Sequence, residues 1–417
     1  MHPTEILTEP DVLILGGGAA GVAAAVGASE GGGSVVLLEK YGFLGGKATA
    51  AYVGTVCGLY YRSEHPDARL VMTGFPATFA AQLGKRSHTQ PVQHKNGLHF
   101  LPYDRFAFIL LCDELAQKHA RSLCLHAHVF AAARDRRRVV EVQASVSHRP
   151  VIFHPKTVVD ASGEAALAGY LNMGLIKSDE YQASAQVFTL AGLRESDEQS
   201  VRLSLLRAIQ RGLAHGDFPK TNERLSIVPG SVGQGRATFK LGIPLSVGNN
   251  PLDASAIELF SRRAVQDILT YLRANTEIFK DTWLAMLAPE TGLRTGARHR
   301  GRYVLTETDV LNCRKWPESI ARGAWPIEFW ETGKDPRMVY FDPEDYYDIP
   351  AGVLQSEELD NLFFAGRNLS ASDEAIASAR VIGTCLATGY AAGRLAAGQV
   401  KNELPEDTRT AIRQALF

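Results

Sequence analysis

The sequence is poor in cysteine, balanced in charge and free of long apolar runs. Its five cysteines are widely spaced and form no CxxC pair: Cys57, Cys112, Cys124, Cys313 and Cys385. This pattern indicates neither a disulfide framework nor a zinc ribbon, and it favours a reducing compartment, so we expect a cytoplasmic protein. No stretch reaches the roughly 20 uninterrupted apolar residues of a membrane helix, so we expect no membrane partner.

The charge balance narrows the class of ligand. The 417 residues include 44 lysines and arginines and 45 aspartates and glutamates, a formal net charge of −1. Without a positive field there is no electrostatic reason to expect a nucleic-acid partner, so a small molecule is the expected ligand. Shares of 45% hydrophobic and 21% charged residues are typical of a globular protein, and the length suffices for more than one domain.

Several targeting and catalytic signals are also missing. The apolar run at 12–28 follows acidic residues and contains three consecutive glycines, so we do not expect a signal peptide. His126 and His128 lie at strand spacing but lack a third ligand, so we expect no metal site. There is no G-x-S-x-G sequence, which leaves nucleophilic serine chemistry without support.

The N-terminal segment carries the clearest structural pattern. A short apolar run at 11–15 is followed by Gly16-Gly-Gly-Ala-Ala-Gly21, an alanine-rich stretch to about Ser29 and a second apolar run at 34–39. Short apolar runs of this kind are typical of strands buried on both faces of a parallel sheet. The order strand, glycine-rich turn, helix and strand predicts a βαβ unit that binds a dinucleotide.

Each glycine of this motif has a physical role. Gly16 permits the tight turn, Gly18 lets the backbone approach a pyrophosphate, and Gly21 allows close packing of helix and strand. The helix N-terminus then offers N–H groups and a positive dipole end to the phosphates. Glu39 ends the second strand, where a carboxylate can accept hydrogen bonds from the ribose of an adenosine. The motif alone leaves open whether the dinucleotide is FAD or NAD.

The loop that follows, Tyr41 to Thr49, reads YGFLGGKAT, and a plain NAD dehydrogenase has no reason for it. It resembles the "LGG-x-AT" signature of the FAD-dependent oxidoreductase family related to the A subunit of heterodisulfide reductase and, more distantly, to glutathione-reductase-type flavoproteins. The resemblance implies FAD as the cofactor. Lys47 stands where the pattern has an uncharged residue, and it could neutralise a phosphate or a reduced flavin.

A second segment, Val158 to Leu167, reads VVDASGEAAL and resembles the "DA-[ST]-G" element of the same family. It places Asp160 at a strand end and Gly163 at the start of a turn. In that family a preceding strand offers a backbone N–H and C=O to adenine. The resemblance implies that Val129 is the residue whose backbone contacts adenine.

The C-terminal match begins at Asn361-Leu-Phe-Phe-Ala-Gly-Arg367 and continues in a helix of small residues at 378–393. It resembles the second flavin-binding element of these enzymes, with Gly366 and Arg367 beside the ribityl chain and pyrophosphate. The helix N-terminus would face the flavin pyrimidine ring and stabilise its negative charge on reduction. The cofactor-binding residues expected from the sequence are Gly16, Gly18, Ala20, Gly21, Glu39, Lys40, Gly46, Lys47, Thr49, Val129, Asp160, Gly163, Gly366, Arg367, Arg380, Gly383, Thr384 and Cys385.

The catalytic groups are less well defined. Residues 291–310 resemble the family's "R-E-S-R-R … G-x-Y-x-L-T-x-x-D-V" stretch, but Thr295 and Gly296 replace its acid and serine. Arg294 and Arg298 keep the register and are candidates for reaching the flavin or an anionic substrate; the alternative is a solvated basic surface. Cys57 is a third candidate, although a lone cysteine is more often a small buried apolar residue.

Because the two flavin elements lie near opposite ends of the chain, the FAD domain must be discontinuous. We expect an α/β fold, with a Rossmann-like FAD/NAD(P)-binding domain formed by 1–178 and 330–417 and an inserted α+β substrate domain at 179–329. Within the insert, Gly230 to Gly235 has the spacing GxxGxG and precedes an alternating stretch instead of a helix. It predicts a hairpin turn, not a second nucleotide loop.

Three functions remain open at this stage. The first is an FAD-dependent oxidoreductase that takes a hydride from a small organic substrate onto flavin N5 and passes electrons to oxygen or another acceptor. The second is an FAD-binding electron-transfer subunit that acts with a partner protein, and self-association is also open. The third, an NAD-only dehydrogenase, leaves the Ala365-Gly366-Arg367 element unexplained.

Overall fold

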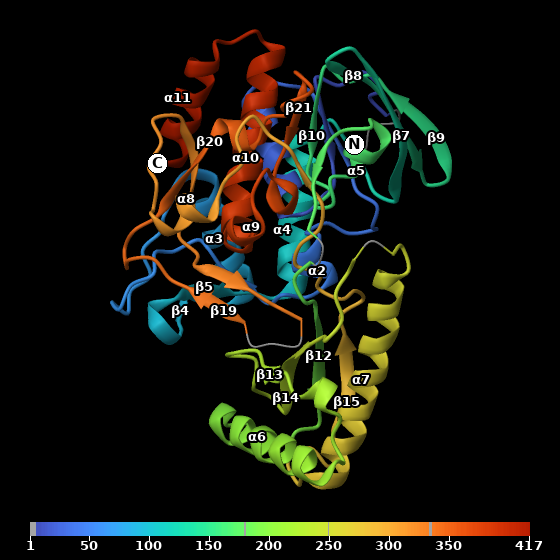
Figure 1. Cartoon of the computed structure of the whole chain (residues 1–417), viewed down its shortest axis with the longest axis vertical. Helices are drawn as coiled ribbons and strands as arrows, with labels where there is room; N and C mark the ends of the chain where they lie inside the picture. Colours follow the sequence, from blue (N-terminus) through green and yellow to red (C-terminus); the bar gives the residue numbers. More distant parts are fainter. Residues whose placement is uncertain (1–5, 179–180, 249, 333–335) are drawn as a thin grey trace.

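Five parallel strands form the sheet on which the larger part of the molecule is built (Figure 1). The computed structural model describes residues 6–178, 181–248, 250–332 and 336–417. The sheet has the order β21-β10-β1-β2-β6, with β1 at Val12–Leu15, β2 at Val35–Leu38, β6 at Ser122–Cys124, β10 at Thr157–Asp160 and β21 at Leu362–Phe364. Every residue of β1, β2 and β10 is buried, as expected for parallel strands covered on both faces.

The predicted βαβ unit is confirmed. Helix α1 spans Ala19–Glu30 between β1 and β2, and β1 pairs in parallel with both β2 and β10. Strand β10, at the start of the segment 158–167, therefore lies next to β1, at the start of the N-terminal motif. β21 then pairs with β10, which brings the C-terminal element to the same sheet. The expected α/β, Rossmann-like fold class is confirmed.

The two faces of the sheet are covered differently. On one face, Val12 and Ile14 pack in a core with α1, with α4 (Arg105–His119) and with α10 (Ile382–Val400). On the other face, Leu13 and Leu15 pack against an antiparallel sheet of β7 (Ala127–Asp135), β8 (Arg138–Val146) and β9 (Arg149–Phe153). The sheet is thus the middle of three layers.

A second lobe carries its own core (Figure 1, lower part). Its antiparallel sheet has the order β13-β14-β12-β15, with β12 at Ala185–Ala191, β13 at Leu225–Ile227, β14 at Arg236–Gly242 and β15 at Trp283–Leu287. Two amphipathic helices, α6 (Glu198–His215) and α7 (Asp253–Asn275), pack on it. β13 pairs with β14 around Gly230–Gly235, so the predicted hairpin turn is confirmed.

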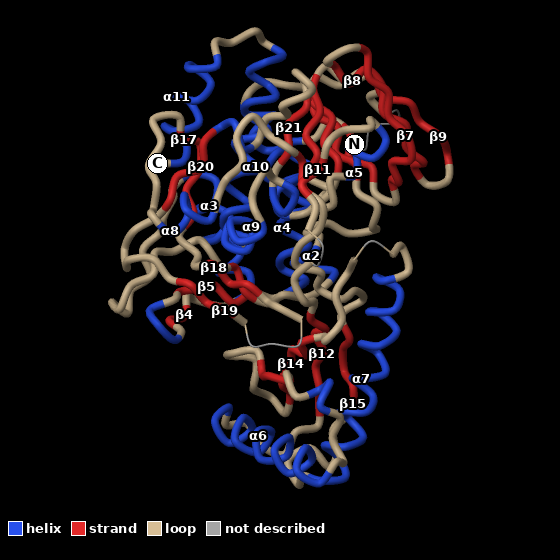
Figure 2. Tube along the Cα trace, in the orientation of Figure 1, coloured by secondary structure: helices blue, strands red, loops and turns tan. Residues whose placement is uncertain are grey.

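The remaining elements complete the molecule (Figure 2). They are α2 (Lys47–Ala50), β3 (Thr55–Val56), α3 (Gly74–Ser87), β4 (Val92–Gln93), β5 (His99–Pro102), α5 (Ala166–Tyr170), β11 (Leu175–Ile176), β16 (Arg298–His299), α8 (Glu307–Leu311), β17 (Ser319–Gly323), β18 (Ile327–Phe329), β19 (Arg337–Val339), β20 (Tyr347–Pro350), α9 (Asp373–Ala379) and α11 (Pro405–Leu416). Several of them, such as α3, α9, β17 and β20, contribute residues to the first core. Within the described ranges, no helix is long and apolar enough to cross a membrane.

The division of the chain at 178 and 330 stays a prediction. The elements of the second lobe's sheet all fall between 185 and 287. β18 pairs with β19 and β17 pairs with β20, so segments on the two sides of residue 330 are joined by strand pairing.

Helices α1 and α10 approach so closely that glycine is required where they meet. A Cβ on Gly389 would lie 2.1 Å from the carbonyl oxygen of Ala20, and one on Gly393 would lie 2.1 Å from that of Ala24. On the other helix, a Cβ on Gly27 would lie 2.2 Å from the carbonyl oxygen of Tyr390. The small residues of both helices therefore set the distance between the first and last flavin elements.

We expect Gly393→Ala to lower the free energy of unfolding by about 2–3 kcal/mol, because the added methyl group forces the two helices apart. The matched control is Gly169→Ala, where a Cβ would meet nothing within 4 Å; this change should be neutral or stabilise by up to about 1 kcal/mol, since alanine is the better helix former. Urea unfolding monitored by circular dichroism measures both. Equal effects of the two changes would contradict the assigned helix contact.

Candidate functional site

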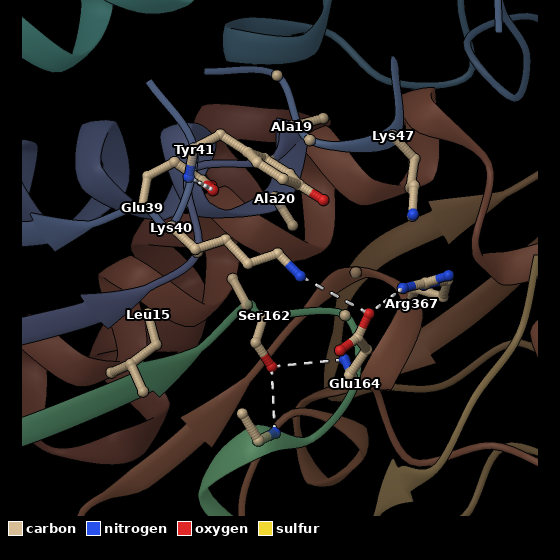
Figure 3. Close-up of a pocket in the computed structure, with 18 of the residues that line it drawn as sticks. Leu15, Ala19, Ala20, Glu39, Lys40, Tyr41, Lys47, Ser162, Glu164 and Arg367 are labelled. Atoms are coloured by element: carbon tan, nitrogen blue, oxygen red, sulfur yellow. Dashed lines mark hydrogen bonds and ion pairs between the residues drawn. The ribbon is translucent and has the colours of Figure 1, made fainter. Parts of the chain in front are cut away.

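A cavity opens at the carboxyl ends of the parallel strands (Figure 3). Its walls come from the turn after β1, the ends of β2 and β10, the loop before α2, the start of β7 and the segment after β21. Thirteen of the residues expected to bind the cofactor line it: Gly16, Gly18, Ala20, Glu39, Lys40, Gly46, Lys47, Val129, Gly163, Gly366, Arg367, Arg380 and Cys385. Segments separated by more than 300 positions thus meet around one space.

Bare backbone forms the floor of the cavity. Gly18 is the N-cap of α1, and no side chain caps the helix there, so the first N–H groups of α1 are available to an anion. Gly18 forms a bridge with Gly45, and a Cβ on Gly46 would lie 2.9 Å from the Cα of Gly18. A side chain at Gly46 would collide with Gly18, so glycine is required at this part of the cavity, the glycine cradle, where we expect a pyrophosphate.

Glu39 lies at the end of β2 with its carboxylate turned back on the turn after β1. It accepts hydrogen bonds from the backbone N–H of Gly17 at 2.6 Å and of Tyr41 at 2.9 Å. Burial raises the pKa of Glu39 to about 7, although the hydrogen bond from Gly17 acts in the opposite direction. The carboxylate has the place and the acceptor capacity that a ribose diol requires.

Cations surround the middle of the cavity. Glu164 lies 3.6 Å from Arg367 and 4.0 Å from Lys40. Dashed lines mark both ion pairs in Figure 3. Lys47 donates from Nζ to Glu290 at 2.5 Å. Burial, reinforced by the nearby charge of Arg367, lowers the pKa of Lys47 to about 7. Lys47, the residue at which the loop departs from the family pattern, therefore carries an amine whose pKa is close to physiological pH.

Five expected cofactor residues do not line the cavity, and each has a structural contact instead. A Cβ on Gly21 would lie 1.7 Å from the carbonyl oxygen of Gly16, so this glycine serves close packing. The hydroxyl of Thr49 donates to the carbonyl of Leu44 at 2.8 Å. Gly383 and Thr384 are buried at the start of α10, facing the segment 57–59.

Asp160, the fifth, supports the cavity wall from below. It accepts hydrogen bonds from the N–H of Ser162 at 3.0 Å, the N–H of Leu167 at 3.2 Å and the side chain of Asn368 at 3.1 Å. It also pairs with His299 at 2.9 Å, both side chains being fully buried. Burial alone would raise the pKa of Asp160, but the contact with His299 and the hydrogen bonds lower it. No motif indicates His299 as the partner of Asp160, because 139 residues separate the two.

Val129 lies on the cavity wall, near the start of β7. Its carbonyl oxygen accepts a hydrogen bond from the hydroxyl of Tyr170 at 3.1 Å. A carbonyl has a second lone pair, so this contact is compatible with the expected part of Val129 beside adenine.

A second cavity, of about 580 Å³, adjoins the first. The two share the lining residues Lys47, Ala48, Arg367, Arg380 and Ile382. On one side the second cavity is walled by the second lobe, with Val187 of β12 and Lys240 of β14. Across it stand Leu98 and Phe100 together with the segment around β18. Its volume falls within the range of small-molecule sites, about 300–1,000 Å³.

The three catalytic candidates have different places. Arg294 and Cys57 line the second cavity, whereas Arg298 lines neither cavity. The guanidinium of Arg298 is buried and donates to the carbonyl of Ala371 at 2.9 Å and to Asp373 at 2.5 Å, contacts that give it a structural part. Burial raises the pKa of Cys57 to about 12, so its sulfur is a neutral thiol at physiological pH.

Sequence reasoning missed the most polar part of the second cavity. Lys240, Glu328, Trp325 and Trp330 line it beside Arg294, and none belongs to a motif. Lys240 lies on a strand that alternates apolar and polar residues, which by itself predicts only a sheet face. No signal in the sequence connects 240 with 328.

The fold and the first cavity together define a dinucleotide-binding enzyme of the flavoprotein class. The glycine cradle and the nearby cations can donate hydrogen bonds to a pyrophosphate, and the carboxylate at the end of β2 can accept them from a ribose. The chain matches the family described as FAD dependent oxidoreductase over residues 11–415. It belongs to that family, and it is an FAD-dependent oxidoreductase.

Solved structures of related fold include the OxyS anhydrotetracycline hydroxylase from Streptomyces rimosus, with 12% identity and a TM-score of 0.50 over 97% of this chain and 65% of that one. Another is a geranylgeranyl bacteriochlorophyll reductase-like protein from Thermoplasma acidophilum, with 13% identity and a TM-score of 0.49 over 97% of this chain and 82% of that one. At such identity the hydroxylase structure shows the fold alone. A search of curated proteins found no match.

We expect Gly18→Ala to lower the affinity for FAD at least about tenfold while changing the free energy of unfolding of the FAD-free protein by no more than about 1 kcal/mol. Its Cβ would meet only the Cα of Gly46, at 3.8 Å, and would enter the cradle. Gly21→Ala should instead unfold the domain, because its Cβ would collide with the carbonyl of Gly16. Flavin fluorescence titration and thermal unfolding separate the two effects. Unchanged FAD affinity in a folded Gly18→Ala protein would contradict the assigned cradle.

Proposed function

We propose that the protein oxidises a small organic substrate held in the second cavity, with the hydride passing to N5 of an FAD held in the first. The observation that carries this proposal is the junction of the two cavities, which share five lining residues. FAD supplies the hydride acceptor. The chain's own residues supply the binding, the orientation and the exclusion of water.

In this proposal different segments of the first cavity bind different parts of FAD. The N-terminus of α1 and the backbone of Gly46 bind the pyrophosphate, and Glu39 accepts hydrogen bonds from the ribose. Gly366 and Arg367 hold the ribityl end near the junction. Val129 offers its backbone to adenine.

Lys47 is the group best placed to move a proton. Its Nζ lies at the junction of the cavities, and its pKa near 7 allows the neutral amine to exist at physiological pH. Glu290 accepts a hydrogen bond from this nitrogen, and burial raises the pKa of Glu290. We infer that Nζ accepts a proton as the substrate is oxidised and passes it to Glu290.

The same proposal includes the closer family relation, the role of the inserted domain and the location of the protein. The loop at 41–49 and the segment 158–167 support a relation to the A subunit of heterodisulfide reductase. The second lobe supports a substrate-binding part for the insert at 179–329, because its β12 and β14 wall the second cavity. All five cysteines are free, which supports a reducing, cytoplasmic location.

The function is tested with the FAD-loaded protein under anaerobic conditions, by adding members of a panel of alcohols, amines, organic acids and reduced ring compounds. We expect at least one defined compound to bleach the flavin absorbance and to yield its two-electron oxidation product. Failure across the panel, together with rapid reduction by a protein electron donor, would favour the electron-transfer subunit instead.

Replacement of Lys47 tests its part directly. We expect the rate of flavin reduction in the native protein to rise between pH 6 and 8, because the neutral amine forms as the pH passes the pKa of about 7. Lys47→Met should lower this rate by about 10²–10⁴-fold and remove the pH dependence. Lys47→Arg should remain slow, since its guanidinium cannot accept a proton. Lys118→Met is the control, because Lys118 is an exposed lysine of α4 that lines neither cavity. A fully active Lys47→Arg protein would defeat the assignment.

A further inference from the structure

The second cavity contains more positive than negative charge. Lys240 from β14, Arg294 from the loop after β15 and Arg380 from the end of α9 line it together. Glu328 of β18 is the carboxylate that lines it with them. These side chains come from segments far apart in the sequence, so their convergence is a property of the folded chain.

Glu328 is already bound on both oxygens. It accepts hydrogen bonds from the indole N–H of Trp325 at 3.0 Å and from that of Trp330 at 2.9 Å. The positive charges of Lys240 and Arg380 keep its pKa low despite burial, which acts the other way. Burial and the charge of Arg294 lower the pKa of Lys240, and an anion bound beside it would favour its charged form. One ionised carboxylate thus stands among three basic side chains.

The cations have unused hydrogen-bonding capacity. Among the described residues, none of the three lies within 4 Å of a carboxylate oxygen. Arg380 donates to the side-chain oxygen of Gln182 at 3.3 Å, while its own Nε and the amide nitrogen of Gln182 are buried without a partner. Buried donors of this kind are costly unless something accepts from them.

An aromatic ring holds two of the charges in place. The guanidinium of Arg294 lies 4.1 Å from the centroid of the Trp330 ring, and the Nζ of Lys240 lies 4.9 Å from it. Arg294 also donates to the carbonyl of Ala183. Burial and the charge of Arg380 lower the pKa of Arg294 to about 9, which leaves it charged at pH 7. The site is therefore organised, and it is short of negative charge.

The rest of the cavity is apolar. Leu98, Phe100, Val187, Ile227 and Met338 form much of the wall away from the cations. A ligand that satisfies the whole cavity needs an anionic group at one end and an apolar body at the other.

We propose that the second cavity binds an organic carboxylate with an apolar body, the carboxylate accepting hydrogen bonds from Lys240, Arg294 and Arg380. This assignment of the substrate class rests on the proposed function, since it takes the second cavity to be the substrate site. Arg380, which lines both cavities, then stands between the carboxylate and the flavin. Lys240 and Arg294 line the second cavity alone and define the specificity.

The test is calorimetric titration of the FAD-loaded protein with acids and their primary amides: benzoate and benzamide, 3-phenylpropionate and 3-phenylpropanamide, octanoate and octanamide. We expect at least one acid to bind at least tenfold more tightly than its amide. Inorganic sulfate should bind more weakly than that acid, because it offers nothing to the apolar walls. Amides that bind as tightly as their acids, or sulfate that binds as tightly as the best acid, would overturn the proposal.

Variants assign the effect to the residues. Arg294→Met and Lys240→Met should each lower the affinity for the acid at least tenfold and leave the affinity for the amide within threefold. Lys240→Arg keeps the charge and should retain most of the affinity. Arg202→Met is the matched control, because Arg202 lines the same cavity but is paired with Glu198 at 2.9 Å; it should change acid binding less than threefold. FAD content and the thermal midpoint verify that each variant is folded.

The outcomes separate this inference from the proposed function. Acid binding that depends on Lys240 and Arg294, without flavin reduction by any compound, would support the carboxylate site and defeat the proposed oxidation. Flavin reduction by neutral compounds, without acid binding, would support the oxidation and defeat the carboxylate site.

Discussion

The buried carboxylate of Asp160 is the constraint on which the arrangement of both cavities depends. It ends β10 and receives hydrogen bonds from three segments: the turn at Ser162, the start of α5 at Leu167 and the segment after β21 at Asn368. It also holds His299. Around this one group, the residues that line the first cavity from 161–166 are fixed relative to Arg367 and to the loop that carries Arg294. An apolar side chain at 160 would leave N–H groups without an acceptor on all of these segments.

The fold could be predicted from local patterns because its main signals are short-range. The run before Gly16 and the run ending at Glu39 lie within one βαβ unit, where sequence order determines spatial order. The hairpin at Gly230–Gly235 was predictable for the same reason. The cluster of Lys240, Glu328 and Trp330 was not, because it forms only when β14 and β18 are brought together, and no periodicity within either strand records that.

Arg294 and Arg298 show how register can mislead. Both keep their places in the family pattern at 291–310, so the pattern made them equal candidates. In the structure Arg294 lies in a loop beside the second cavity. Arg298 lies on the short strand β16 and donates hydrogen bonds to Ala371 and Asp373. The expected cofactor residues show the same limit: Gly21 and Asp160 belong to the motifs, yet they shape the cavity from behind its wall.

The two tryptophans that bind Glu328 give the second cavity an optical property. The protein has four tryptophans, and Trp325 and Trp330 both line this cavity. Half of the chain's indole rings therefore lie beside the site, where a change in local charge or water content alters their emission. Because Trp330 also lies against the cations of Lys240 and Arg294, neutralising those charges changes the electric field across its ring. The intrinsic fluorescence of the unlabelled protein is thus a built-in reporter of what enters the cavity.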